Sequence, residues 1–98
     1  MAAEHHQETA RLRVLVTGRV QGVSFRYYAR RRAEGLGLVG WARNLQDGAT
    51  VEVVAEGPRP ALAQFLQLLQ TGSRRASVTQ VEVEWSVAEG KFQLFQIW

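Results

Sequence analysis

The hydrophobic pattern alternates with a period of two near both ends of the chain, and this alternation predicts β-strands. Residues 11–17 read RLRVLVT, with Leu12, Val14 and Val16 on one face. Residues 81–87 alternate as strictly, with Val, Val, Trp and Val opposite Glu, Glu and Ser. We therefore expect both strands to bury one face against a core and to expose the other.

The middle of the chain predicts a hairpin, and the C-terminal region predicts a short closing strand. Strands are expected at residues 39–45 and 50–56. Asp-Gly at positions 47–48, between them, is a strong short-range hairpin signal. Glu-Gly at positions 89–90 is expected to turn the chain into a last strand over residues 92–97, where apolar and polar positions alternate again.

A first helix is predicted between the first two strands. Apolar residues recur at helical spacing from Phe25 to Leu36, and the arginines between them keep mostly to other faces. Ser24 is the expected N-cap, and Gly35 or Gly37 is expected to end the helix.

A second helix is expected to open at Pro58 and Pro60, because proline is tolerated in the first turn of a helix. Its apolar stripe consists of Leu62, Phe65, Leu66 and Leu69. The predicted order is βαββαβ followed by a short terminal strand. We therefore predict one α+β domain over residues 11–98 with a ferredoxin-like arrangement, an antiparallel sheet with two helices on one face. Residues 1–10 are expected to form a flexible tail.

This topology is expected to bring residues that are distant in sequence to one edge of the sheet. Because the first helix returns the chain, the strand at residues 39–45 should run parallel to that at residues 11–17. Arg43 and Asn44 should then emerge beside the loop at residues 18–24, with one strand, roughly 10 Å, between them. A phosphate-sized group contacted from both sides would span that gap.

The loop itself carries the candidate chemistry. GRVQGVSFR leads into a helix N-terminus, where unpaired N–H groups and the helix dipole favour an anion. Arg26, in the first helical turn, offers a planar fork suited to two phosphate oxygens. The predicted cradle consists of the backbone amides of Gly18, Arg19, Val20, Gln21, Gly22, Val23 and Ser24. A plain glycine turn with a solvated arginine is the alternative, and the convergence with Asn44 favours the anion site.

Other motifs are interpreted structurally. The loop lacks the lysine of a Walker phosphate loop, and the sequence has no cysteine to act as a thiol nucleophile. GLGLVG at residues 35–40 follows a helix and opens a strand, the reverse of a dinucleotide-binding fingerprint. The three arginines at residues 30–32 are interpreted as a solvated helix face.

Composition narrows the class of partner only slightly. The formal net charge is +3, and eleven of the twelve cationic residues are arginine, which fits an anionic ligand or a nucleic acid. We assign no metal to the adjacent pair His5 and His6. No apolar stretch approaches membrane-spanning length, and residues 1–10 lack the apolar core of a signal peptide. A cytoplasmic location is expected.

Two stretches, GRVQGVSFR and GLVGWARNLQDG, together resemble the acylphosphatase family, and the likeness extends from the first strand to the C-terminal residues. The resemblance implies hydrolysis of acyl phosphates to a carboxylate and inorganic phosphate, on a ferredoxin-like fold and without a metal or other cofactor. It implies that Arg26 binds the phosphate and that Asn44 positions the attacking water. Ser24, Ala42 and Leu45 depart from residues common in the family, and substrate preference and rate therefore stay open.

We expect a monomeric enzyme that acts on a small-molecule acyl phosphate, with no nucleic-acid or membrane partner. A carboxylate departs without a strong general acid, so positioning and charge stabilisation can supply the catalysis. Two alternatives stay open at this point. One is a module that uses the same loop to bind an anion or RNA without catalysis, and the other is a phosphate-handling part of a larger enzyme.

Overall fold

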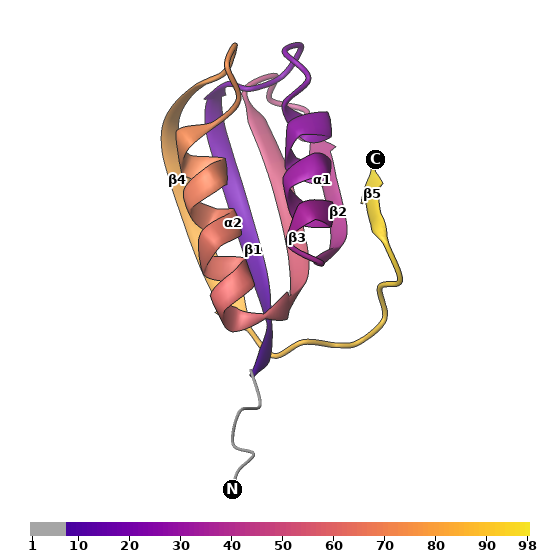
Figure 1. Ribbon diagram of the computed structural model, residues 1–98. Helices are drawn as coiled ribbons and strands as arrows, with labels where there is room; N and C mark the ends of the chain where they lie inside the picture. The colour runs from indigo at the N-terminus through magenta and orange to yellow at the C-terminus, as the bar shows by residue number, and fades with distance from the viewer. Residues whose placement is uncertain (1–7) are drawn as a thin grey trace, which may run out of the picture.

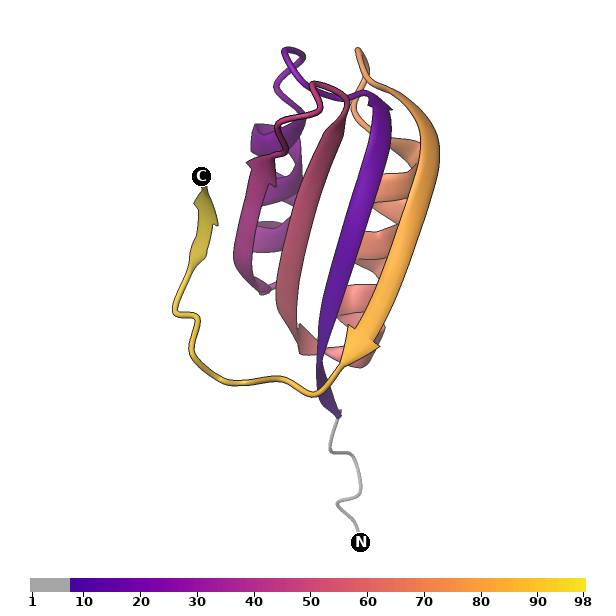
Figure 2. The same ribbon diagram turned by 180° about the vertical axis from the view of Figure 1, so that it is seen from behind.

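The computed structural model describes residues 8–98, which form a five-stranded sheet with two helices packed on one face (Figures 1 and 2). The elements are β1 (Thr9–Arg19), α1 (Phe25–Gly35), β2 (Val39–Asn44), β3 (Thr50–Pro58), α2 (Arg59–Thr71), β4 (Ser77–Ser86) and β5 (Phe95–Ile97). The strand order is β4-β1-β3-β2-β5. The predicted α+β, ferredoxin-like arrangement is confirmed.

β1 lies inside the sheet and buries the face that its alternation predicts. Leu12, Val14 and Val16 have no exposed surface, and the strand pairs antiparallel with β3 and β4. β1 begins at Thr9, so two residues of the predicted tail belong to the strand. Ala10 is buried there, which explains why the pairing extends so far.

The two helices cover the buried face of the sheet with the predicted apolar stripes. Their buried residues are Phe25, Tyr28, Ala29 and Ala33 of α1 and Leu62, Phe65 and Leu69 of α2. α1 ends at Gly35, and Gly37 follows with a φ of 72°, a left-handed conformation that favours glycine just after a helix.

The predicted β2–β3 hairpin is confirmed, and Asp47 holds its turn. The carboxylate of Asp47 accepts hydrogen bonds from the N–H groups of Ala49 (2.8 Å) and Thr50 (2.9 Å) and from the Thr50 hydroxyl (2.6 Å). The Thr50 hydroxyl bond, followed by the Ala49 bond, lowers the pKa of Asp47. Gly48 has a φ of 75°, which suits the tight turn.

The C-terminal region differs most from the prediction. Val87, predicted on the buried face of a strand, lies beyond β4 and is 83% exposed. The chain then passes the lower end of the sheet to its opposite edge (Figure 2). Only three residues form β5, and they pair parallel with β2. The predicted antiparallel sheet is therefore correct for four strands, and β5 makes it mixed.

A buried carboxylate in β3 anchors this long connection. Glu56 accepts hydrogen bonds from the N–H groups of Glu89 (2.8 Å) and Gly90 (3.0 Å) and from the Arg11 guanidinium (3.3 Å). Glu89 and Gly90, predicted to turn the chain directly into a strand, instead begin the crossing to β5. Because the sequence pattern is local, it could not show this contact with β3.

β3 lies between β1 and β2 and is antiparallel to both, so β1 and β2 run parallel to each other. Their C-terminal ends therefore lie at the same edge of the sheet, as predicted. This edge carries the loop that enters α1 and the last residue of β2, Asn44. No helix within residues 8–98 is long and apolar enough to cross a membrane.

Candidate active site

The loop after β1 and the end of β2 form one concave site. A cavity of about 260 Å³ is lined by Val20, Gly22, Ser24, Phe25, Arg26, Tyr27 and Asn44. The predicted meeting of Arg26 and Asn44 is therefore present in the structure. The carboxyl end of one strand and the N-terminus of a helix supply the two residues from opposite sides.

Gly18 and Arg19 belong to β1 and pair with β4, so they lie outside this loop. The Gly18 N–H group donates to the Ala49 carbonyl oxygen (2.9 Å) and is not free to bind an anion. Gly18 has a φ of 139°, and a Cβ here would collide with the carbonyl oxygen of Ser77. Glycine at this position therefore permits close strand packing, a role different from the predicted cradle.

The remaining loop, residues 20–24, has the backbone shape of an anion-binding nest. Gly22 and Ser24 have φ values of 76° and 62°, whereas Val23 between them does not have a positive φ. Such alternation turns successive N–H groups toward one side of the chain. The N–H groups of residues 20–24 donate no hydrogen bond to protein atoms within residues 8–98. They are therefore free to bind a ligand.

Ser24 contributes its backbone conformation and not the predicted cap. It occupies the N-cap position of α1, but its side chain makes no capping hydrogen bond. The left-handed φ explains this difference, because a capping residue normally has extended backbone angles that aim its oxygen at the first helical turn. The predicted capping role of Ser24 is wrong. Sequence spacing gave no sign of a left-handed serine.

Arg26 is held in place by the C-terminal residue of the sequence. Its Nη1 donates to the main-chain oxygen of Trp98 at 2.6 Å. The Trp98 N–H group donates to the Ala42 oxygen (2.9 Å), and the Trp98 indole stacks on that of Trp41, with ring centroids 4.6 Å apart. A guanidinium has five N–H donors, so donors remain for a bound anion.

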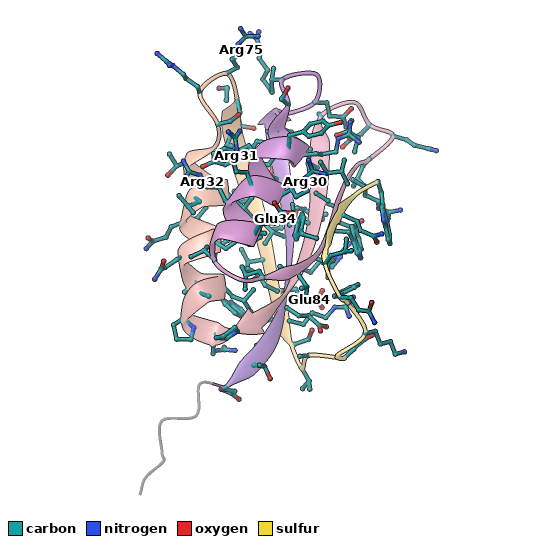
Figure 3. The ribbon with its side chains drawn as sticks, turned by 45° about the vertical axis from the view of Figure 1, so that its right-hand side comes forward. Arg30, Arg31, Arg32, Glu34, Arg75 and Glu84 are labelled. Carbon is teal, nitrogen blue, oxygen red and sulfur yellow. The ribbon has the colours of Figure 1, made fainter. Side chains whose placement is uncertain are left out.

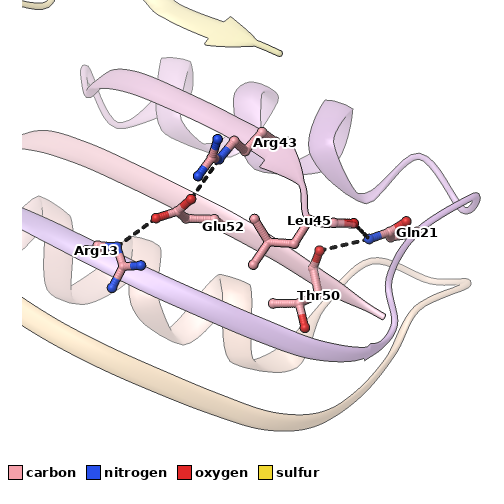
Figure 4. A network of polar contacts seen from close by, with 6 residues as sticks. All are labelled: Arg13, Gln21, Arg43, Leu45, Thr50 and Glu52. Carbon is pink, nitrogen blue, oxygen red and sulfur yellow. Dashed lines mark hydrogen bonds and ion pairs between the residues drawn. The ribbon is translucent and has the colours of Figure 1, made fainter. Parts of the chain in front are cut away.

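Gln21 ties the loop to the β2–β3 hairpin. Its side-chain Nε2 donates to the carbonyl oxygens of Leu45 (2.8 Å) and Thr50 (2.9 Å), as Figure 4 shows. These bonds fix the distance between the loop and Asn44, the residue before Leu45. Sequence reasoning missed this role and considered only the Gln21 backbone amide. A signal was present in the sequence: Gln21 has a long amide side chain, and it lies in a loop predicted to emerge at the same edge of the sheet as the hairpin.

The side chains of Asn44 and its neighbour Arg43 lie on opposite faces of the sheet, because side chains alternate along β2. Ala42 is buried beneath the helices, so Asn44, two residues on, faces the same side, on which α1 begins. Arg43 faces the uncovered side of the sheet. There its Nε donates to Glu52 at 2.7 Å, and the Nε of Arg13 donates to the same carboxylate at 2.7 Å (Figure 4).

Glu52 is a buried carboxylate outside the cavity, held between two arginines. Burial raises its pKa, but the hydrogen bonds from Arg13 and Arg43 outweigh burial, and its pKa lies below the ordinary value. Arg26 is the charged residue among the seven that line the cavity, so the field there is positive. Within residues 8–98, no three His, Asp or Glu side chains gather as metal ligands. His5 and His6 lie outside the described residues.

The fold and the site define a small α+β protein with a positively charged cavity at a strand–loop–helix junction. Comparison with known proteins identifies its family. The family model described as Acylphosphatase matches residues 12–97. A curated acylphosphatase of Thermus thermophilus is 55% identical over 80 residues, 82% of this chain and 90% of the relative.

Two further matches agree. An acylphosphatase of Dehalococcoides mccartyi is 51% identical over 86 residues, 88% of this chain and 94% of the relative. The crystal structure of acylphosphatase from Bacillus subtilis superimposes with a TM-score of 0.85 at 40% identity, covering 90% of this chain and 97% of that one. The chain belongs to the acylphosphatase family, and hydrolysis of acyl phosphates is what this family does.

Proposed function

We propose that this chain hydrolyses acyl phosphates in the cavity between its β1–α1 loop and Asn44. Arg26 and the free N–H groups of residues 20–24 hold the phosphoryl group, and Asn44 orients the attacking water. One observation carries this proposal: Arg26, Asn44 and the left-handed loop line the same cavity. A phosphoryl group in that cavity would lie between the amides and guanidinium on one side and the Asn44 side chain on the other.

The reaction needs little proton transfer from the protein. The oxygen of water attacks phosphorus in line with the acyl oxygen, and the bond between phosphorus and that oxygen breaks. The carboxylate leaves with the bonding electrons, and the proton of the water passes to a phosphate oxygen. Positive charge and fixed donors around the phosphoryl oxygens then stabilise the transition state. No His, Asp or Glu lines the cavity, which agrees with a mechanism without a protein base.

We propose with this mechanism that the reaction needs no metal ion, and that the substrate is a small molecule. A carboxylate is a good leaving group, and the residues that line the cavity offer no set of metal ligands. A monomeric enzyme, independence from nucleic acid and a cytoplasmic location are part of the same proposal.

Hydrolysis of benzoyl phosphate in the presence of EDTA tests the proposal. The parent should turn over, and Arg26→Ala and Asn44→Ala should each lose about a hundredfold or more in rate. Arg26→Lys should fail as well, because it keeps the charge and loses the planar fork. Arg59→Ala, at the start of α2, removes the same charge away from the cavity and should keep the parent rate.

The alternative outcome is informative. A folded parent that binds inorganic phosphate but does not hydrolyse benzoyl phosphate would make the loop a binding site without catalysis. Turnover that vanishes with EDTA and returns with a divalent ion would overturn the metal-independent mechanism. If Asn44→Ala kept the parent rate, the role given to Asn44 would be wrong.

A further inference from the structure

A second, larger cavity lies on the other side of the loop that enters α1. Its volume is about 480 Å³, against about 260 Å³ for the candidate active site. It lies between α1 and the connection from α2 to β4. The lining residues are Val23, Ser24, Tyr28, Arg31, Arg32, Ser73, Arg74 and Arg75.

Four arginines converge on this cavity from two segments. Arg31 and Arg32 come from α1, and Arg74 and Arg75 come from the connection after α2. Figure 3 shows Arg31 and Arg32 on the part of α1 turned toward α2, and Arg75 on the connection above them. No Asp or Glu lines the cavity, and none of the four forms an ion pair with a carboxylate of residues 8–98. Four unmatched like charges in one hollow repel each other until an anion enters.

The three arginines at residues 30–32, predicted to form one solvated helix face, lie beside two different cavities. Arg30 stacks over the Tyr27 ring, 5.4 Å from its centroid, toward the active-site cavity that Tyr27 lines. Arg32 stacks over the Tyr28 ring at 5.4 Å, and the Tyr28 hydroxyl donates to the Leu68 oxygen at 2.9 Å. Because Tyr28 is buried and fixed, the guanidinium on it is preorganised at the wall of the larger cavity.

A hydroxyl in the same wall lacks a partner. The Ser73 Oγ is buried and makes no hydrogen bond to any atom of residues 8–98. An unpaired buried hydroxyl is unfavourable, and rotation of the Ser73 side chain toward the cavity would let this hydroxyl donate to an anion bound there. The arginines therefore carry the proposal below, and Ser73 adds a further donor.

We propose that these four arginines bind a compact oligophosphate chain, either inorganic or carried by a nucleotide. A planar guanidinium binds two oxygens of a phosphate, and four of them exceed what one phosphate can satisfy. The cavity volume suits a ligand of a few phosphates. A long nucleic acid would need a positive track that extends beyond the four arginines of the cavity.

This site is separate from the proposed active site, and the proposal does not depend on hydrolysis. Arg26 and Asn44 do not line the larger cavity, and the arginines of the larger cavity do not line the smaller one. Ser24 lines both cavities, so a ligand in the larger one contacts the end of the phosphate loop. Binding can therefore be measured in protein from which the active-site arginine, Arg26, has been removed.

Calorimetric titration of Arg26→Ala protein with inorganic tripolyphosphate tests the proposal. We expect one bound ligand per chain and at least a tenfold loss of affinity when Arg31→Ala and Arg75→Ala are added, because each removes charged hydrogen bonds. Adding Arg30→Ala and Arg59→Ala instead removes the same charge outside the cavity, and should leave affinity within about threefold. Arg31 and Arg75 are exposed, and thermal unfolding of each variant verifies that the fold is retained.

Two comparisons distinguish the sources of the ligand. If a nucleoside triphosphate binds with the same affinity as tripolyphosphate, the phosphate chain is the recognised group. If the nucleoside triphosphate binds more tightly, the nucleoside makes further contacts with the protein. Both outcomes support the site. Orthophosphate should bind at least tenfold more weakly. Equal loss in the two pairs of variants, or orthophosphate binding as tightly as tripolyphosphate, would show nonspecific charge attraction and overturn the proposal.

Discussion

The Arg26 guanidinium donates a 2.6 Å hydrogen bond to the main-chain oxygen of Trp98, 72 positions further along the chain. The first turn of α1 is thereby joined to the residue that follows β5. The Trp98 indole lies against Trp41 of β2, with the two ring planes only 10° from parallel. The orientation of Arg26, the proposed phosphate-binding residue, therefore depends on packing at the edge of the sheet opposite β4.

Loss of the Trp98 contact should weaken phosphate binding without unfolding the protein. Trp98→Ala keeps the main-chain oxygen that Arg26 contacts but removes the indole stacking that fixes its position, and should raise the inhibition constant of inorganic phosphate a few fold. Deletion of Trp98 removes the hydrogen bond to Arg26 and the indole stacking together. It should raise the inhibition constant of inorganic phosphate about tenfold or more, as loss of a hydrogen bond to a charged group does. Inhibition of benzoyl phosphate hydrolysis measures both values. Equal effects of the two changes would show that the hydrogen bond to the Trp98 main-chain oxygen contributes nothing.

The Gln21 side chain should matter for turnover although only the backbone N–H group of this residue is proposed to contact the phosphoryl group. Gln21→Ala removes both bonds to the hairpin, so the loop amides and Asn44 are no longer held at a fixed separation. We expect about a tenfold loss in kcat, because preorganised donors are effective only when correctly placed. Gln46→Ala removes an exposed glutamine from the hairpin itself and serves as the matched control. A parent-like kcat for Gln21→Ala would contradict the positioning role.

Ser24 gives a stability prediction opposite to that of an N-cap. Removal of a capping serine by alanine costs about 1 kcal/mol, but here no capping bond exists, so Ser24→Ala should change the free energy of unfolding by less than about 0.5 kcal/mol. Ser24→Gly should stabilise by up to about 1 kcal/mol, because glycine adopts the left-handed conformation without steric cost. Urea denaturation at constant m-value measures both. Equal free energies of unfolding for the alanine and glycine variants would show that the left-handed backbone at residue 24 is not strained.

Glu52 should give the protein part of its resistance to acid. Its pKa is lower in the folded state than the ordinary value of 4.5, so between these values the unfolded chain binds more protons than the folded one. Stability from Glu52 is therefore complete above about pH 4.5 and is lost as the pH falls through the folded pKa. Glu52→Gln should unfold more easily at pH 7, by about 1–2 kcal/mol from weaker hydrogen bonds to Arg13 and Arg43. As the pH falls below about 4.5, the variant should also lose stability less steeply than the parent, as denaturation curves at each pH would show.

Periodicity and topology predicted the framework that positions the site. The alternation in β1 identified Leu12, Val14 and Val16 as core, and all three are fully buried. The meeting of Arg26 with Asn44 followed from the order of elements alone, because the crossover through α1 makes β1 and β2 parallel. Such features depend on many residues at once, so a sequence pattern carries them well.

Features that depend on a single long-range contact could not be predicted from the hydrophobic pattern of the sequence. β5 has three residues, and its place beside β2 depends on Glu56 anchoring the connection from β4. The Gln21 bonds and the engaged Gly18 amide likewise require the folded position of the β2–β3 hairpin. Propensity also assigned a capping role to Ser24 where tertiary packing selected a left-handed backbone. Local sequence alone does not determine the partners of these contacts.

Docking of β5 beside β2 links the core to the site. Phe95 of β5 is buried, and its ring packs edge-on against Phe65 of α2, so the core is complete only when the last strand is in place. The same strand carries the chain to Trp98, whose main-chain oxygen accepts the hydrogen bond from Arg26. Completion of the core and orientation of Arg26 therefore depend on a single event, the docking of three C-terminal residues.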